Sequence, residues 1–149
     1  MKWNVKDIEL FMSEKEYVDT ALIPLVSVQF DTHMKRAAEQ GEFIQLLSMH
    51  LERQFKGRMV LLPSFAYVQE PEEELDLLMK WKQNAKAGGF TNVFFLTADK
   101  RWNTLVEESM ASLFYVPSIP LEHLEEKYKH AAMEDQLKTL IPKMIKNWG

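Results

Sequence analysis

Two adjacent glycines, a short apolar run and a polar segment follow one another in the second half of the chain. Gly88 or Gly89 can supply the left-handed residue that commonly ends a helix. The run over 93–96 has the length and composition of a strand that is covered on both faces. Thr97 and Asp99 come next, and such side chains accept hydrogen bonds from the first turn of a following helix. Helix, buried strand and capped helix in this order indicate a parallel α/β unit.

Three further segments have the pattern of strands. The first candidate spans 21–30, and apolar and polar residues alternate over its second half. Because Pro24 cannot donate to a ladder, the strand either begins near Leu25, which is the favoured interpretation, or lies at an edge of the sheet. An apolar run over 59–62 and another over 111–116 are each followed by a proline, and both predict buried strands. Between 64 and 70 we expect a loop with exposed aromatic side chains.

Apolar residues at helical spacing occupy the intervals between these strands. The predicted helices follow Asn4, extend from Asp31 or Thr32 to Phe55, begin at Pro71, run from about 100 to 108, and run from about 121 to Trp148. We expect Gly41 to divide or kink the second helix, and Pro142 to cause a kink or a restart near Leu140 in the last.

The order of these elements predicts an α/β fold. We expect a small, mainly parallel sheet of about four strands with helices on both faces, an extra N-terminal helix and a long C-terminal helix. Right-handed crossovers give a strand order such as 2-1-3-4. The 149 residues fit a single domain over 1–149, because domains commonly hold about 100–150 residues.

Composition excludes several classes of protein. Cysteine is absent, which rules out disulfides, thiolate metal sites and cysteine nucleophiles and fits a reducing cytosol. The net charge is −4 and the basic residues are dispersed, so nucleic-acid binding is not expected. The first ten residues carry no secretory signal, and no apolar run approaches the roughly 20 residues that span a bilayer. We expect a soluble cytoplasmic protein without membrane insertion.

Polar residues follow each predicted strand, where α/β sheets bind ligands. These candidate crevice residues are Asp31, Thr32, His33, Ser64, Tyr67, Thr97, Asp99, Arg101 and Ser118. Asp31 and Asp99 with His33 could act as general acid and base or hold a hard cation. The favoured alternative is that both carboxylates only cap helices, since caps are wanted at these positions in any case.

The recognised catalytic and cofactor motifs are missing. The chain contains no GxGxxG, GxxxxGK[ST], GxSxG or HExxH sequence, so no cofactor and no catalytic residue is predicted. The histidines, His33, His50, His123 and His130, do not form a metal signature. His123 and His130 are seven apart and could share a helix face, but a solvated pair is the favoured interpretation, and no metal is predicted.

Four apolar residues near the C-terminus have the three-four spacing of a packing seam. They are Leu137, Ile141, Met144 and Trp148. Packing back onto the sheet is the favoured interpretation. The alternative is a seam that docks onto a second copy of the chain or onto a protein partner.

Several segments resemble one bacterial family along the whole chain. They are residues 1–3, 16–25, 42–47 and 51–58. The sequence resembles the YpiF-like proteins, an uncharacterised family of spore-forming Gram-positive bacteria. The resemblance transfers no catalytic residue. Because family members are encoded near a menaquinol–cytochrome c reductase, it implies an accessory role in respiration.

Two hypotheses of function remain open at this stage. The preferred one is a non-enzymatic accessory or interaction module of the cytosol, supported by the missing motifs and the apolar C-terminal seam. The alternative is a small-molecule or anion-binding α/β domain, with or without an enzymatic activity, that uses the crevice beyond the strands. The second hypothesis predicts a concave pocket on which Asp31, His33, Thr97, Asp99 and Arg101 converge.

Overall fold

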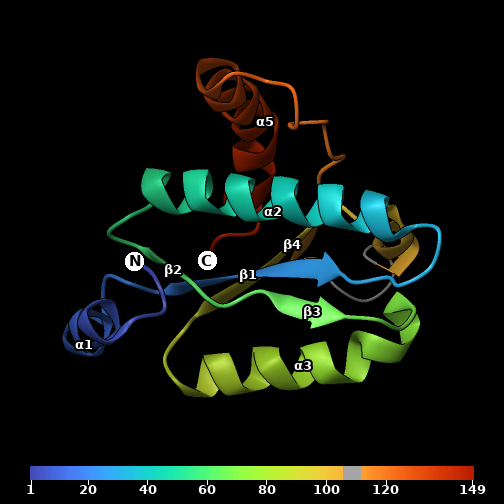
Figure 1. The fold of residues 1–149 in the computed structure, drawn as a ribbon. Coiled ribbons are helices and arrows are strands. Elements are labelled where there is room, and N and C mark those ends of the chain that lie inside the picture. Colours follow the sequence, from blue (N-terminus) through green and yellow to red (C-terminus); the bar gives the residue numbers. More distant parts are fainter. Residues whose placement is uncertain (106–111) are drawn as a thin grey trace.

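The computed structural model describes residues 1–105 and 112–149, and these contain one parallel sheet with helices on both faces (Figure 1). The strands are β1 (Thr20–Ser27), β2 (Met59–Leu61), β3 (Phe65–Tyr67), β4 (Asn92–Thr97) and β5 (Leu113–Tyr115). The helices are α1 (Val5–Ser13), α2 (Met34–Gln54), α3 (Pro71–Ala87), the short 3₁₀ helix η1 (Lys100–Trp102) and α5 (Glu126–Lys146). The order β2-β1-β4-β5, with β3 also paired to β1, confirms the predicted α/β fold.

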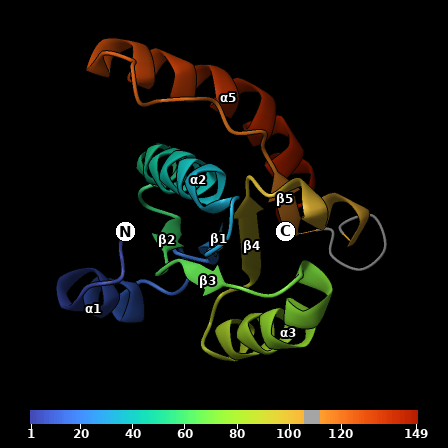
Figure 2. The ribbon, with the colours of Figure 1, turned by 45° about the vertical axis from the view of Figure 1, so that its right-hand side comes forward.

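Successive residues of the central strands contribute to separate cores on the two faces of the sheet. Phe95 of β4 belongs to the core beneath α1 and α3, which includes Phe11 and Leu78. Its neighbour Phe94 belongs to the core beneath α2 and α5, which includes Leu47. Figure 2 shows these two helix pairs on opposite sides of the sheet. Every residue of β4 is therefore buried, as the uninterrupted apolar run predicts.

The central strand β1 begins at Thr20 rather than near Leu25, so the predicted late start is wrong. Leu22 accepts a hydrogen bond from the backbone N–H of Leu62, 2.9 Å away, on the β2 side of the strand. Because backbone groups alternate sides along a strand, Pro24 directs its ring nitrogen to that same side. It has no partner there, since β1 pairs with β2 through 20–22 and with β3 through 25–27. The missing N–H of proline therefore costs no ladder bond.

Helix α2 passes Gly41 without a break, so the predicted division at this glycine is wrong. The reason for glycine is a close approach to the sheet. A Cβ atom at position 41 would lie 3.0 Å from Cγ1 of Val26 on β1. The missing side chain lets α2 lie close against the central strand.

The segment after Pro63 is strand β3, not the predicted loop with exposed aromatics. Phe65 and Tyr67 are both buried, and Phe65 packs edge-on against Trp81 of α3 with 6.0 Å between ring centroids. Pro63 ends β2, and the chain rejoins the same edge of β1 further along. The alternation of buried and exposed residues that indicates a strand is hard to recognise here, because β3 has only three residues.

Helix termini follow the sequence in part. Asn4 caps α1 and accepts a hydrogen bond from the N–H of Asp7 at 2.8 Å, as predicted. Helix α5 begins at Glu126 rather than near 121, and it contains Pro142 without a restart. Its buried residues Leu137, Leu140 and Met144 lie on both sides of the proline, so packing holds the turn that lacks one hydrogen bond.

Two predicted elements extend beyond the described residues. Of the helix expected over 100–108, the residues 100–105 are helical in the structure, and 106–108 lie outside the described residues. Of the strand expected over 111–116, β5 accounts for Leu113–Tyr115.

Candidate functional site

A polar crevice lies where the chain leaves the carboxyl ends of β1 and β4. Its volume is about 350 Å³. Seven charged or titratable side chains line it: Asp31, His33, Arg36, Glu70, Asp99, Lys100 and Arg101. These residues come from the turn before α2, from the first turn of α2, from the position preceding α3, and from the segment around η1. Ligands of parallel α/β sheets bind at this edge.

Asp99 anchors a buried hydrogen-bond network on one wall of the crevice. The hydroxyl of Tyr67 donates to Oδ2 of Asp99 at 2.7 Å, and Nε1 of Trp102 donates to that hydroxyl oxygen at 2.8 Å. Thr97 accepts the backbone N–H of Asp99 at 3.0 Å through its Oγ1. Asp99 also caps η1 by accepting the N–H of Arg101 at 3.1 Å. The network joins the ends of β3 and β4 to η1.

Arg101 closes this network towards solvent. Its Nε donates to Oδ1 and its Nη2 to Oδ2 of Asp99, at 3.0 and 2.7 Å. Nη2 also donates to Oγ of Ser27 at 3.2 Å, and Nη1 to Oε2 of Glu70 at 3.1 Å. Most donors of the guanidinium are therefore used within the protein, which makes Arg101 a brace between β1, η1 and the residue preceding α3.

The network fixes the protonation states of its members. Burial alone would raise the pKa of the Asp99 carboxyl, but the hydrogen bonds from Arg101 and Tyr67 and the positive charge of Arg101 outweigh burial and hold this pKa below its usual value. Burial, followed by the hydrogen bond to Asp99, raises the pKa of the Tyr67 hydroxyl. Hydrogen bonding to Asp99 raises the pKa of Arg101. Asp99 is thus a carboxylate whose oxygens are occupied, and it is not free to act as a base or to bind a cation.

Asp31 organises the turn that leads into α2. Its Oδ1 accepts the backbone N–H of His33 at 2.8 Å and lies 3.3 Å from Nδ1 of the same residue. The hydrogen bond from the His33 backbone N–H lowers the pKa of Asp31. The N-cap position of α2 is His33, which makes no capping hydrogen bond through its side chain. Asp31 therefore supports the turn ahead of the helix, and it shares the crevice with His33 as an exposed pair.

The crevice gathers only part of the predicted residue set. Thr97 and Tyr67 are buried in the wall behind it. Ser64 lines a different hollow beside Pro24, Thr32 is exposed, and neither Thr32 nor Ser118 lines this crevice.

Sequence reasoning missed Arg36, which enters the crevice from the first turn of α2. Arg36 could have been predicted from its spacing of three residues from His33, because residues three apart lie on the same face of a helix.

The apolar residues near the C-terminus pack against the sheet of their own chain. Leu137 and Met144 are buried, and Ile141 and Trp148 pack against the same core. The indole of Trp148 donates to Oγ1 of Thr20 at 2.7 Å. These four side chains do not form a free surface, so the docking hypothesis loses the observation on which it was based.

A different apolar surface is open between α1 and α3. This groove has a volume of about 620 Å³. Trp3, Met12 and Leu77 line it and are 58%, 65% and 45% exposed, respectively. Lys15 and Lys80 also line it. Of the helices in the described parts of the chain, none combines the length and apolar character that crossing a bilayer requires.

Fold and crevice together define an α/β protein with a polar hollow at the carboxyl edge of a parallel sheet. Residues 9–148 match the family described as "Protein of unknown function (DUF2487)", and the chain belongs to that family. It is similar to the "Uncharacterized protein YpiF" of Bacillus subtilis (strain 168), with 35% identity over 149 residues that cover 100% of this chain and 99% of the relative. This confirms the resemblance found in the sequence. No solved structure matches the chain.

Proposed function

We propose that this protein is a small-molecule-binding α/β domain of the cytosol whose ligand carries an anionic group and occupies the carboxyl-edge crevice. The observation that carries the proposal is a pair of uncommitted cations. Arg36 from α2 and Lys100 from η1 line the same crevice. Across residues 1–105 and 112–149, neither side chain makes an ion pair or a hydrogen bond with another side chain.

The third cation of the crevice supports the proposal in another way. Arg101 donates hydrogen bonds to Asp99, Glu70 and Ser27. It therefore forms part of the crevice wall and leaves ligand binding to Arg36 and Lys100. A guanidinium and an ammonium group without partners are suited to a carboxylate or phosphate group. The crevice volume of about 350 Å³ lies at the lower end of the range of about 300–1,000 Å³ typical of small-molecule sites.

A thermal-shift screen against carboxylates, phosphate esters and nucleotides tests this function. A ligand that binds only the folded protein raises the melting temperature in proportion to the logarithm of its excess over its dissociation constant. We expect at least one anionic compound to raise it, and the double variant Arg36→Ala/Lys100→Ala to lose the shift. Lys35→Ala is the matched control, because this lysine lies on the same turn of α2 and is absent from the crevice lining. A shift that survives in the double variant would refute the assignment.

A second candidate function is the accessory or interaction module, and the groove between α1 and α3 favours it. Trp3, Met12 and Leu77 present apolar surface there that no other part of the described chain covers. Lys15 and Lys80 line the same groove and favour a protein partner whose apolar segment carries acidic residues. Leu77→Glu should abolish partner capture, with Leu10→Glu as the control, since Leu10 is similarly exposed and lies outside the groove. Equal capture by both variants would exclude the groove as the docking surface.

A further inference from the structure

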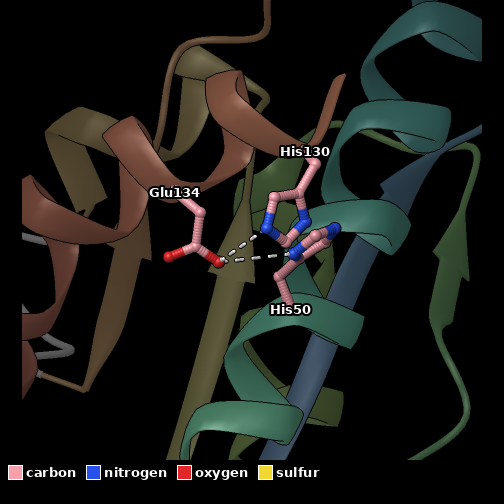
Figure 3. Close-up of side chains that lie close together, drawn as sticks. All are labelled: His50, His130 and Glu134. Atoms are coloured by element: carbon pink, nitrogen blue, oxygen red, sulfur yellow. Dashed lines mark ion pairs between the residues drawn. The ribbon is translucent and has the colours of Figure 1, made fainter. Parts of the chain in front are cut away.

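Three potential metal ligands meet between α2 and α5, away from the crevice (Figure 3). His50 lies near the end of α2, while His130 and Glu134 lie one turn apart on α5. Oε1 of Glu134 is 3.8 Å from Nδ1 of His50 and 3.9 Å from Nε2 of His130. The three ligand atoms all lie within 4.8 Å of one another. Two helices far apart in sequence thus direct two imidazoles and a carboxylate to one point.

These separations are too long for hydrogen bonds and close to what a shared metal ion requires. Hydrogen bonds in proteins have donor–acceptor distances of about 2.7–3.2 Å. Ligand atoms at about 2.0–2.1 Å from a tetrahedral zinc ion lie about 3.3–3.4 Å from one another. A movement of roughly half an ångström would bring the two distances from the carboxylate oxygen to that value. The two imidazole nitrogens, which lie within 4.8 Å of each other, would have to approach by up to about 1.4 Å. The carboxylate oxygen therefore lies where it could ligate the same metal ion as both imidazoles.

We propose that His50, His130 and Glu134 form a binding site for zinc or a similar divalent transition metal. Two imidazole nitrogens and one carboxylate oxygen are a donor set of zinc sites with three protein ligands and a solvent ligand. The same nitrogen donors disfavour magnesium and calcium, which prefer oxygen ligands. The fourth position is available to water because the side chains of His130 and Glu134 are 63% and 38% exposed.

The surroundings of His50 support a fixed ligand. Its side chain is only 8% exposed, so its orientation is held by packing between the helices. A bound ion would tie the first half of α5 to α2.

The test is calorimetric titration of the full-length, chelator-treated protein with Zn²⁺ alone, repeated with Co²⁺ for its absorption spectrum. We expect one ion per chain and a melting temperature that rises with Zn²⁺. Glu134→Gln and His130→Ala remove exposed ligands without opening the core. Loss of an outer-shell partner already costs about 10–100-fold in affinity, so each variant should bind at least about 100-fold more weakly.

His123→Ala is the matched control, because His123 also faces a carboxylate, Glu122, at 3.8 Å, but no third potential ligand joins the pair among residues 1–105 and 112–149. It should bind Zn²⁺ as tightly as the unaltered protein. Three results would each overturn the proposal: no saturable binding of one ion per chain, undiminished binding by Glu134→Gln and His130→Ala, or an equal loss in His123→Ala. The crevice proposal is unaffected by any of them, because its residues are different.

Discussion

Replacing Tyr67 by phenylalanine should destabilise the protein far more than the loss of one oxygen atom suggests. The hydroxyl donates to the Asp99 carboxylate at 2.7 Å and accepts from the indole N–H of Trp102 at 2.8 Å. Trp102 is fully buried, so its N–H would find no water. Tyr67→Phe therefore removes one charge-assisted hydrogen bond and leaves one buried donor without a partner.

The magnitude follows from these two losses. A hydrogen bond to a charged group contributes about 1.5–3 kcal/mol, and an orphaned buried donor costs about 1–3 kcal/mol. Asp99 keeps its hydrogen bonds from Arg101, which places the first loss at the low end. The free energy of unfolding should fall by about 2.5–4.5 kcal/mol, a large share of the roughly 5–15 kcal/mol typical of whole proteins.

Urea denaturation measures this difference as a shift of the midpoint at constant slope. Tyr115→Phe is the matched control, because Tyr115 is half-buried on β5 and its hydroxyl makes no hydrogen bond among the described residues. The control should stay within about 0.5 kcal/mol of the unaltered protein. A Tyr67→Phe variant as stable as the control would refute the account of the network.

Three further predictions test other parts of the structure. The pKa of Asp99 is lowered in the folded protein, so its carboxylate stabilises the fold fully above the unfolded pKa of about 3.9, and this stabilisation is lost as the pH falls through the folded pKa. In urea titrations, the difference in unfolding free energy between the unaltered protein and Asp99→Asn should therefore be smaller at pH 3 than at pH 7. A difference that does not depend on pH would contradict a stabilising Asp99 carboxylate. Gly41→Leu should lower the free energy of unfolding in urea titrations by about 1–3 kcal/mol, because the added side chain would push α2 away from β1. The double variant Gly41→Leu/Val26→Ala should regain part of this stability. A Gly41→Leu variant as stable as the unaltered protein would exclude the close contact between Gly41 and Val26. Trp148→Ala should lower the free energy of unfolding by about 2–4 kcal/mol, because Trp148 contacts Phe55, Phe94 and Arg58; a fully buried aromatic residue would cost about 3–5 kcal/mol. The control Trp3→Ala removes an exposed tryptophan and should leave the melting temperature nearly unchanged. Equal melting temperatures of the two variants would contradict the packing of Trp148 against the core.

The α/β class was predictable because the decisive signals are local. The six residues of β4 are all buried, so an uninterrupted apolar run records their environment directly. The glycine pair also behaved as predicted: Gly89 has a φ of 118° and ends the chain reversal between α3 and β4. Both signals depend on residues close together in sequence.

The errors arose where a distant element decides the local conformation. Pro24 is compatible with a central strand only because β2 has ended and β3 has not begun beside it. Gly41 marks a helix pressed against β1, not a helix boundary. Neither neighbour is visible from the residues around the proline or the glycine.

The candidate crevice was predictable in position but not in roles. The strand-end rule brought Asp31, His33, Asp99 and Arg101 to one hollow. It could not foresee that Tyr67 and Arg101 would occupy the Asp99 carboxylate, because these contacts join residues of three separate elements. The approach of His50 to α5 was hidden for the same reason.

The most direct test of ligand binding in the crevice is the amide NMR spectrum of the ¹⁵N-labelled protein, titrated with an anionic compound that raises its melting temperature. We expect shifted signals around Asp31–Arg36 and Asp99–Arg101, the two segments that carry the cations Arg36 and Lys100. Shifts centred instead on Trp3, Met12 and Leu77 of the apolar groove, with the crevice signals unmoved, would contradict ligand binding in the crevice.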